Sequence, residues 1–447
     1  MKPSHNKAPR TTDKAPKPKL AYLMSRFPKI SETFILFEIL EMEKLGAAVE
    51  VYPLLRERQP VTHPEAEKMS ARAHFLPFLS WPIVRANLYF MRTRPLRYFG
   101  ALLEVLFGTI GYRNFFFGVF AYWPKAAAFA YKMQQQGVAH VHAHFCNHPA
   151  LAAFIVHRLT GIPYSFIAHG SDLHKNRTML GKKVAASAFA VTVSKFNLEV
   201  LRGACEEHDR KKTSLLRCGI DPEVFFPKTK TASTGALRII CVASFEEVKG
   251  HKHLVEACRL LRKRGVGFVC DLIGDGPRRA EITRQIKAAR LESSVIVHGS
   301  MKRNDVVSML TAADVKVLAS VPTAEGKREG VPVVLMEAMA CGLPVISSQL
   351  SGIPELVEHG RTGILLPPGD AEGLAKALEQ LQNDPALRQR MGQAGREKVV
   401  REYNLKENTK QLLQMILAAK AQRGVAEKPV ASSTHESSHR KSSALAL

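Results

Sequence analysis

Short apolar runs alternate with helical segments along most of this 447-residue chain, in two successive blocks. The expected strands of the first block are 20–25, 49–54, 140–145, 163–168 and 190–194, and those of the second block are 237–243, 268–273, 295–299, 315–319 and 344–347. Strands separated by helices form a parallel sheet with helices on both faces. The pattern therefore predicts an α/β protein of two doubly wound, Rossmann-like domains.

These blocks divide the chain into five expected segments. We expect a disordered basic tail at 1–19, a first domain at 20–226, a second at 227–401, a helix at 402–420 that crosses back to the first domain, and a disordered tail at 421–447. Within the first domain, Ser31 is the expected cap of a helix that ends near Gly46. Two tandem sheets leave a cleft between them, and open α/β sheets bind ligands at the carboxyl ends of their strands.

The formal net charge of +24 is unevenly placed. Part of it lies in the tails, but seven basic residues between Arg85 and Lys132 face only one acid, Glu104, and are interleaved with aromatic residues. Basic and aromatic residues together favour an anionic membrane surface over DNA. A solvated helical surface over an aromatic core explains the pattern equally well.

The segment 101–123 is apolar enough to raise the question of a membrane span, but Glu104, Arg113 and Asn114 interrupt it. Residues 1–19 are polar and basic and do not read as a secretory signal. The seven cysteines lack C-x-x-C spacing, which is typical of a reducing compartment. We therefore expect a cytoplasmic protein, peripheral on the inner face of the cell membrane.

The most specific motif places Glu329 and Glu337 eight residues apart. They bracket the turn Gly330-Val331-Pro332 and the start of a helix, where unpaired N–H groups can bind an anion or sugar hydroxyls. Glu337 lies in an otherwise apolar run, where an unpartnered carboxylate would cost several kcal/mol. We therefore expect Glu337 to face the cleft and accept ribose hydroxyls.

This motif and its continuation through 340–347 and 351–357 resemble the retaining GT-B glycosyltransferases with an E-x(7)-E motif, of the group 1 or family 4 type. The resemblance covers about 237–403 and includes Lys249-Gly250, 273–277 and the linker residues 219–221 and 226–227. Residues 27–34, 142–145 and 168–172 look like the branch that builds colanic acid and other exopolysaccharides. The resemblance implies a GT-B fold, with two Rossmann-like domains facing across a cleft.

The resemblance also implies roles for individual residues. Lys249 would stabilise the departing diphosphate, Glu329 would contact the transferred sugar, and His169 would lie beside that sugar. The neighbouring Asp172 is a weaker candidate. Family members usually carry an arginine five residues before the lysine, and here that position is Ser244, which leaves one phosphate contact unaccounted for.

Two further patterns concern the nucleotide and metal ions. Gly274 and Gly276 do not complete a G-x-G-x-x-G fingerprint and are expected to end a strand near the nucleotide. His142 and His144 lie on one face of a strand but have no third ligand nearby in the sequence, so a strand-end pair near the cleft is preferred over a zinc site. The sequence contains no D-x-D. We expect no metal and no cofactor.

The predicted function is retaining transfer of a hexose from a UDP- or GDP-sugar to a lipid-linked or growing saccharide, in exopolysaccharide, capsule or lipopolysaccharide synthesis. A GT-B epimerase or another non-transferring relative is the alternative. The net charge alone suggests a nucleic-acid-binding protein, but its aromatic residues fall in one early segment, so no nucleic-acid partner is expected.

Overall fold

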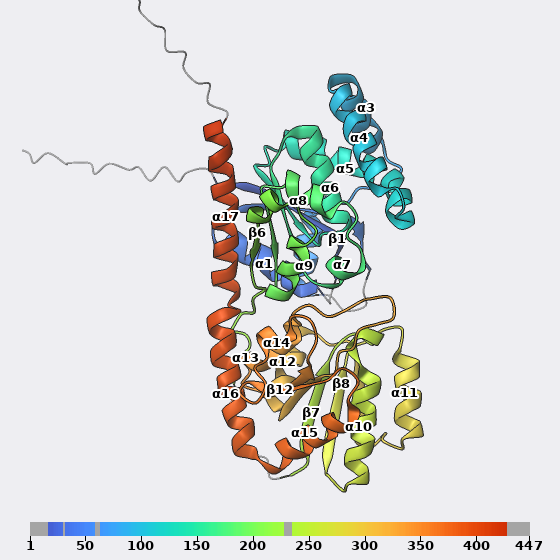
Figure 1. Cartoon of the computed structure of the whole chain (residues 1–447), viewed down its shortest axis with the longest axis vertical. Helices are drawn as coiled ribbons and strands as arrows, with labels where there is room; N and C mark the ends of the chain where they lie inside the picture. The colour runs from blue at the N-terminus through green and yellow to red at the C-terminus, as the bar shows by residue number, and fades with distance from the viewer. Residues whose placement is uncertain (1–16, 30–31, 59–62, 228–234, 427–447) are drawn as a thin grey trace, which may run out of the picture.

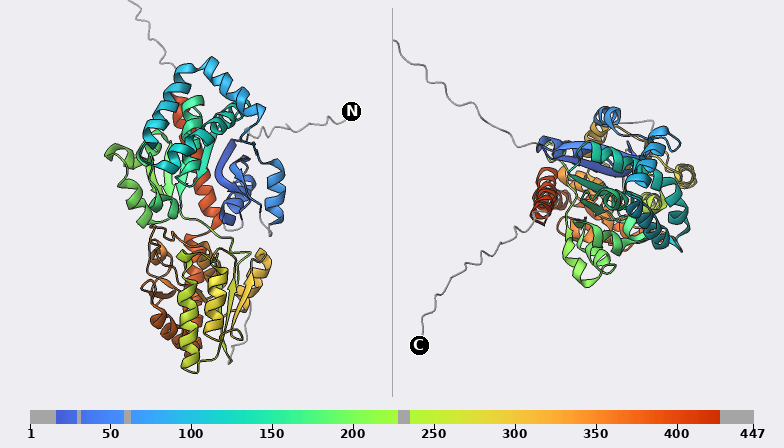
Figure 2. Two further views of the ribbon diagram at one scale, coloured as in Figure 1. Left: turned by 90° about the vertical axis from the view of Figure 1, so that its right-hand side faces the viewer. Right: turned by 90° about the horizontal axis from the view of Figure 1, so that it is seen from above.

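The computed structural model describes residues 17–29, 32–58, 63–227 and 235–426. Two six-stranded parallel sheets form separate domains that lie end to end (Figures 1 and 2). The N-terminal sheet has the order β2-β1-β3-β4-β5-β6, from Ala48–Arg56, Lys19–Phe27, His140–His144, Tyr164–Ala168, Phe189–Thr192 and Thr213–Leu215. The C-terminal sheet has the order β12-β11-β10-β7-β8-β9, from Gly363–Leu366, Val345–Ser348, Val315–Leu318, Leu237–Val242, Phe268–Ile273 and Val295–Gly299.

Helices cover both faces of each sheet. Those of the N-terminal domain are α1 (Thr33–Lys44), α2 (Pro64–Arg72), α3 (Trp81–Thr93), α4 (Pro95–Thr109), α5 (Arg113–Gln135), α6 (His148–Thr160), α7 (Ser171–Lys175), α8 (Leu180–Ala186) and α9 (Lys195–Arg202). Those of the C-terminal domain are α10 (His251–Lys263), α11 (Arg279–Ala288), α12 (Arg303–Ala312), α13 (Val333–Ala340), α14 (Ile353–Leu356), α15 (Ala371–Asn383) and α16 (Pro385–Glu402), and α17 (Leu405–Ala426) follows.

The first sheet buries three histidines on one face of β3. Its sequence alternates His140, Val141, His142, Ala143 and His144, and successive side chains of a strand point to opposite faces. Tyr22 of β1 packs against two of these rings, with centroids 5.4 and 5.6 Å away. The alternation thus creates a buried layer of histidine side chains on one face of the sheet.

Two chain crossings join the domains, and they lie side by side. Ile220 donates its backbone N–H to the Tyr403 carbonyl at 2.9 Å and accepts the Leu405 N–H at 3.0 Å. The neighbouring Gly219 leaves no room for a Cβ against the Leu405 backbone. After this crossing α17 packs against α1 of the N-terminal domain (Figure 1).

The strands expected from the sequence lie within a few residues of those observed. The crossing helix expected at 402–420 corresponds to α17, which begins at Leu405 because residues 403–405 pair with the linker. This helix extends to Ala426 and so includes residues 421–426 of the tail that was expected to be disordered. Three of the expectations fall outside the described residues: the Ser31 cap, residues 1–16 of the first tail and residues 427–447 of the second tail.

Helices α3, α4 and α5 extend from the outer edge of the N-terminal domain (Figure 1). Phe90, Tyr98, Val105, Phe115 and Trp123 pack inside this helical extension. No helix in the described part of the chain is both long and apolar enough to span a bilayer.

Candidate functional site

A cavity of about 390 Å³ lies between the two domains, where strands of both sheets end. Nine of the residues singled out in the sequence line it: Ser244, Lys249, Gly274, Glu329, Gly330, Val331, Pro332, Glu337 and, from the N-terminal domain, His169. Gly276 instead packs behind the wall, where a Cβ would lie 2.8 Å from the Phe245 backbone.

Lys249 and Glu329 form an ion pair in the wall of this cavity. The Lys249 Nζ lies 2.7 Å from Glu329 Oε1, and the two side chains are only 20% and 13% exposed. Lys249 ends a short 3-10 turn, and the left-handed Gly250 (φ 66°) starts α10 against the Ala319 carbonyl, where a Cβ would clash. The fold therefore fixes a lysine cation beside a carboxylate at the edge of the cleft.

Glu337 lies on α13, which begins directly after Pro332. Burial raises its pKa to about 7, although the positive charges of Arg303 and Lys316 favour the ionised form. Arg303 lies over the Phe37 ring of the N-terminal domain, 3.8 Å from its centroid. Glu337 is thus a carboxylate that is poised to change its protonation near neutral pH.

The structure shows what surrounds Ser244, the departure from the family pattern. Its hydroxyl donates to Glu246 Oε1 at 3.2 Å, and the other Glu246 oxygen pairs with Lys327 Nζ. Both Glu246 and Lys327 line the cavity. A second cation, besides Lys249, therefore stands close to Ser244, the position where the family resemblance implies an arginine.

His169 follows β4 and lies between aromatic rings. Its ring packs against Phe34 and Phe145, with centroids 4.8 and 4.9 Å away, and burial lowers its pKa to about 4. The neighbouring Asp172 is buried and does not line the cavity. Its Oδ1 accepts the backbone N–H groups of His169 and Gly170 at 3.1 and 2.8 Å, so its role is to hold this loop.

The two domains touch backbone to backbone beside this histidine. A Cβ on Gly170 would lie 2.9 Å from the Gly330 Cα, and a Cβ on Gly330 would collide with the His169 carbonyl. Gly170 also has φ of 157°, a region that side chains rarely adopt. Glycine at both positions therefore lets the loop after β4 in one domain meet the Glu329 turn of the other.

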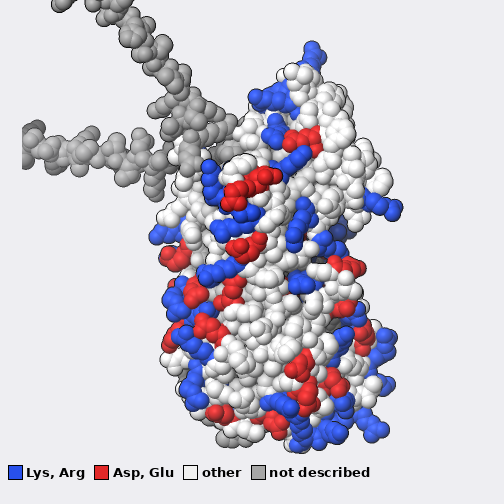
Figure 3. Space-filling view, viewed as in Figure 1, with Lys and Arg blue, Asp and Glu red and all other residues white. Residues whose placement is uncertain are grey.

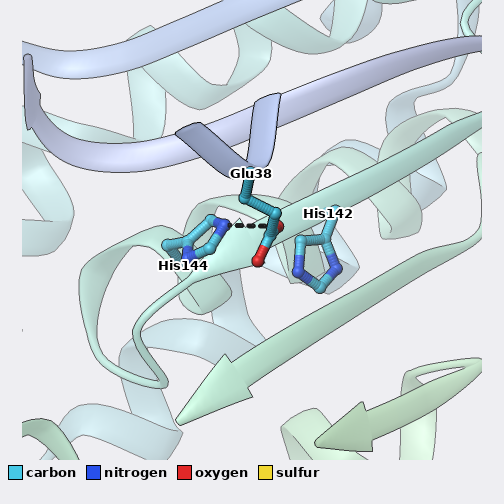
Figure 4. Close-up of side chains that lie close together, drawn as sticks. All are labelled: Glu38, His142 and His144. Carbon is cyan, nitrogen blue, oxygen red and sulfur yellow. Dashed lines mark hydrogen bonds and ion pairs between the residues drawn. The ribbon is translucent and has the colours of Figure 1, made fainter. Parts of the chain in front are cut away.

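Glu38 was missed in the sequence. It comes from α1 and lies beside His142 and His144, and ligand atoms of the three residues all lie within 4.8 Å of one another (Figure 4). The sequence argument found no third ligand for this histidine pair, because Glu38 is about a hundred residues away along the chain. Arg303 and Lys327 were missed because no motif marks either of them, although Lys327 lies only two residues before Glu329.

Comparison with known proteins finds a family model that matches part of the chain. Residues 223–398 match the family model described as glycosyl transferases group 1. The amylovoran biosynthesis glycosyltransferase AmsK of Erwinia amylovora is 42% identical over 194 residues, which are 43% of this chain and 48% of AmsK. The putative colanic acid biosynthesis glycosyltransferase WcaL of Escherichia coli is 39% identical over 215 residues, 47% of this chain and 52% of WcaL. The matches thus span about half the length of these curated relatives.

Solved structures are similar over nearly the whole chain. HepE of Anabaena, in complex with UDP-glucose, superposes with a TM-score of 0.67 at 15% identity and covers 90% of this chain and 99% of HepE. A glycosyltransferase from Rickettsia africae gives 0.66 at 15% identity, with 91% and 99% covered. At this identity the likeness concerns the fold, which is GT-B with two Rossmann-like domains. Within that fold, residues 223–398 are the part of the chain that matches the group 1 glycosyltransferase model.

Proposed function

We propose that this chain is a retaining glycosyltransferase that moves a hexose from a UDP- or GDP-sugar to a lipid-linked or growing saccharide in exopolysaccharide, capsule or lipopolysaccharide synthesis. The observation that carries the proposal is the convergence of Lys249, Glu329 and Glu337 on one cavity between two Rossmann-like domains. The names of AmsK and WcaL support the exopolysaccharide setting, and the UDP-glucose bound to HepE supports a nucleotide-sugar donor.

The donor is expected to bind with its ribose hydroxyls on Glu337 and its diphosphate near Lys249 and the turn at Gly330 and Val331. In the ligand-free protein Lys249 is paired with Glu329. The diphosphate would draw the lysine toward itself, and Glu329 would then be free to accept sugar hydroxyls. Because charge develops on the diphosphate as the glycosidic bond breaks, a fixed cation there lowers the barrier.

Metal independence is part of the proposal. Lys249, and Lys327 next to Ser244, would supply the positive charge that a divalent ion provides in other transferases. We expect chelation with EDTA to leave turnover largely unchanged. Loss of activity that Mn²⁺ restores would contradict this part of the mechanism.

Stereochemistry follows from the groups around the cleft. An inverting enzyme needs a base opposite the leaving group, and double displacement needs a carboxylate nucleophile at C1. Glu329 and Glu337 are assigned to sugar and ribose. The proposed route is therefore front-face attack: the C1–O bond to the diphosphate breaks, the acceptor oxygen bonds to C1 from the same face, and a phosphate oxygen takes the acceptor proton.

Proton NMR of the first product formed from an α-linked nucleotide sugar tests this function. An α-glycoside is expected, and the matched control is the Lys249→Ala protein purified in the same way, which should form almost none. A β-glycoside would overturn the mechanism. Conversion of the nucleotide sugar to its epimer without an acceptor would instead support the alternative function.

We also propose that the helical extension holds the enzyme on an anionic membrane surface. Of eighteen large apolar side chains that are exposed in the described part of the chain, thirteen lie between Phe78 and Phe120. They include Trp81, Phe107 and Phe117, which are 71, 69 and 64% exposed. A concentration of this kind marks an interaction site rather than ordinary surface.

Charge indicates which partner this surface fits. Four arginines of the extension are exposed: Arg85, Arg92, Arg97 and Arg113. Its single acid, Glu104, is paired with Arg158 through two hydrogen bonds of 3.0 Å. The upper right of the space-filling view shows a broad uncharged surface with basic residues at its margins (Figure 3). Each such residue contributes about 1 kcal/mol near anionic lipid.

Sedimentation with phosphatidylglycerol vesicles tests this location. The full chain should pellet with these vesicles and much less with phosphatidylcholine, and a variant with Trp81→Ser, Phe107→Ser and Phe117→Ser should remain in solution. The control, Ile296→Ser with Leu417→Ser, removes exposed apolar side chains elsewhere and should still pellet. A dimer in solution that the triple variant dissociates would instead make this surface a contact between two copies.

A further inference from the structure

A chain of hydrogen bonds runs from the cavity into the core of the N-terminal domain. The Nε2 of His169 lies 3.1 Å from Nδ1 of His144, and Nε2 of His144 lies 3.2 Å from Oε1 of Glu38. The Tyr22 hydroxyl donates to the same Glu38 oxygen at 3.0 Å. At the cavity end, Cys218 Sγ lies 3.8 Å from the other ring nitrogen of His169.

Burial keeps the two histidines of this hydrogen-bond network neutral, which restricts the direction of each hydrogen bond. The side chain of His144 is completely buried and that of Glu38 is 14% exposed. Burial lowers the pKa of His144 to about 3 and that of His169 to about 4, so both rings are neutral at pH 7. A neutral imidazole has one N–H donor and one acceptor nitrogen, so each bond determines the direction of the next.

The donor and acceptor roles along these hydrogen bonds are set by Glu38. Its Oε1 accepts from Tyr22 and faces Nε2 of His144, so His144 carries its proton on Nε2. Nδ1 of His144 is then an acceptor, and His169 must supply the proton from its own Nε2. This leaves Nδ1 of His169 as an acceptor that faces the Cys218 thiol.

We propose that Glu38 and His144 are positioning residues that fix His169 as the neutral Nε2–H tautomer and hold its ring against the sugar site. The idea rests on the proposed function, because His169 affects turnover only if a sugar binds beside it. The His144 and His169 rings lie nearly parallel, at an interplanar angle of 13°. Because His144 is the only ring between Glu38 and His169 in this series of hydrogen bonds, a substitution at Glu38 acts on the cavity through His144.

The direct test is NMR of the full chain labelled with ¹⁵N-histidine. Two-bond proton–nitrogen correlations report which ring nitrogen carries the proton, and the His169→Gln spectrum assigns the signal. We expect His169 to be protonated at Nε2 in the native chain. Glu38→Gln should preserve this tautomer, because an amide oxygen still accepts from His144, whereas Glu38→Leu should give a mixture or the opposite tautomer.

Kinetics on the same variants separate positioning from loss of fold. For Glu38→Leu we expect kcat to fall at least about tenfold while KM for the nucleotide sugar changes by less than about twofold, with Glu38→Gln close to the native enzyme. His144→Gln should resemble Glu38→Leu. The matched control is His140→Gln, a buried histidine of the same strand that bonds Ser165 at 2.7 Å and lies outside the chain of bonds.

Three results would overturn the inference: a His169 proton on Nδ1 in the native chain, the same tautomer in Glu38→Leu, or an equal loss of kcat in His140→Gln. A metal ion bound stoichiometrically by Glu38, His142 and His144 would also overturn it, because His144 Nε2 would then bind the ion instead of donating to Glu38. If no variant transfers sugar, the proposed function fails, while the tautomer result still decides the positioning.

Discussion

The two domains present their polar groups to the shared cleft in opposite ways. The C-terminal domain offers charges at the surface of the cavity, such as the Lys249–Glu329 pair, whose members come from loops. The N-terminal domain lines the cavity with fewer charges, among them Glu32, and its His169 is neutral, with hydrogen-bond partners that lie in the core behind it. In the proposed reaction this difference would divide the roles: charge would hold the diphosphate on one side, and a neutral, oriented ring would face the sugar from the other.

The sharpest test of this comparison removes the donor-side charge. Lys249→Ala should lower kcat/KM by about 10²–10³, because the departing diphosphate loses its fixed cation and Glu329 loses its partner. Initial rates with a saturating acceptor measure this loss. Lys252→Ala, an exposed lysine on the adjoining helix α10, is the control and should retain near-native rates. A loss below about fivefold would remove Lys249 from its assigned role.

A second test separates the domains at their contact. Gly330→Ala places a methyl group against the His169 carbonyl, so the cleft must open and turnover should fall by about 10²-fold. Small-angle X-ray scattering should show a larger radius of gyration. Gly100→Ala adds a methyl group in open space on α4 and should change neither quantity. Native turnover in Gly330→Ala would show that this contact is not needed for catalysis.

A third test uses pH to examine Glu337 alone. Its pKa of about 7 means that the proton is largely retained at pH 6 and largely lost at pH 8. If the ionised form accepts both ribose hydroxyls, Kd for a nucleotide sugar should fall about tenfold as pH rises from 6 to 8. Isothermal titration calorimetry measures this, and Glu337→Gln should bind weakly with no such dependence. The opposite slope would contradict the assignment to ribose.

Glu329 and Glu337 should also differ in kinetics. Glu337→Ala is expected to raise KM for the donor mainly, because ribose contacts are equal in the ground and transition states. Glu329→Ala is expected to lower kcat mainly, because contacts to the sugar change as C1 flattens. Steady-state kinetics at pH 8 measure both quantities. If kcat falls and KM rises by the same factors in both variants, the two glutamates do not have the distinct roles proposed here.

The smallest expected effect concerns the replaced arginine. Lys327 is about 38% exposed in its pair with Glu246, so Lys327→Ala should lower kcat/KM only about fivefold. Adding Ser244→Arg should recover most of that loss, because it restores a cation at the family position. Failure of the double variant, with Ser244→Arg alone near native, would show that Lys327 does not substitute for the arginine.

The fold and the donor side of the site were largely predictable, because their signals are local. Glu329 and Glu337 are separated by one turn and the first residues of α13, so a single motif brings both to the cavity. The Glu38–His144 contact joins residues 106 positions apart, and nothing near either one marks the other. Only the packing of α1 on the sheet brings them together.

The helical extension shows a second kind of feature that could not be predicted from the sequence. Its basic and aromatic residues fitted a membrane surface and an aromatic core equally well, and the structure contains both arrangements. Phe115 and Trp123 are buried, whereas Phe117 and Phe120 of the same helix are more than 60% exposed. Helix α5 carries apolar side chains on all of its faces, so its composition alone could not identify which face is exposed to solvent.

The contact between Gly170 and Gly330 also constrains how such enzymes can be recombined. Because each domain approaches the other through bare backbone, compatibility at this point depends on the absence of a side chain rather than on matched surfaces. An N-terminal domain grafted from another GT-B protein should dock in this geometry only if it carries glycine at the equivalent of Gly170. For chimeras that exchange this domain, glycine at both positions is therefore a necessary condition, in addition to the other contacts between the domains.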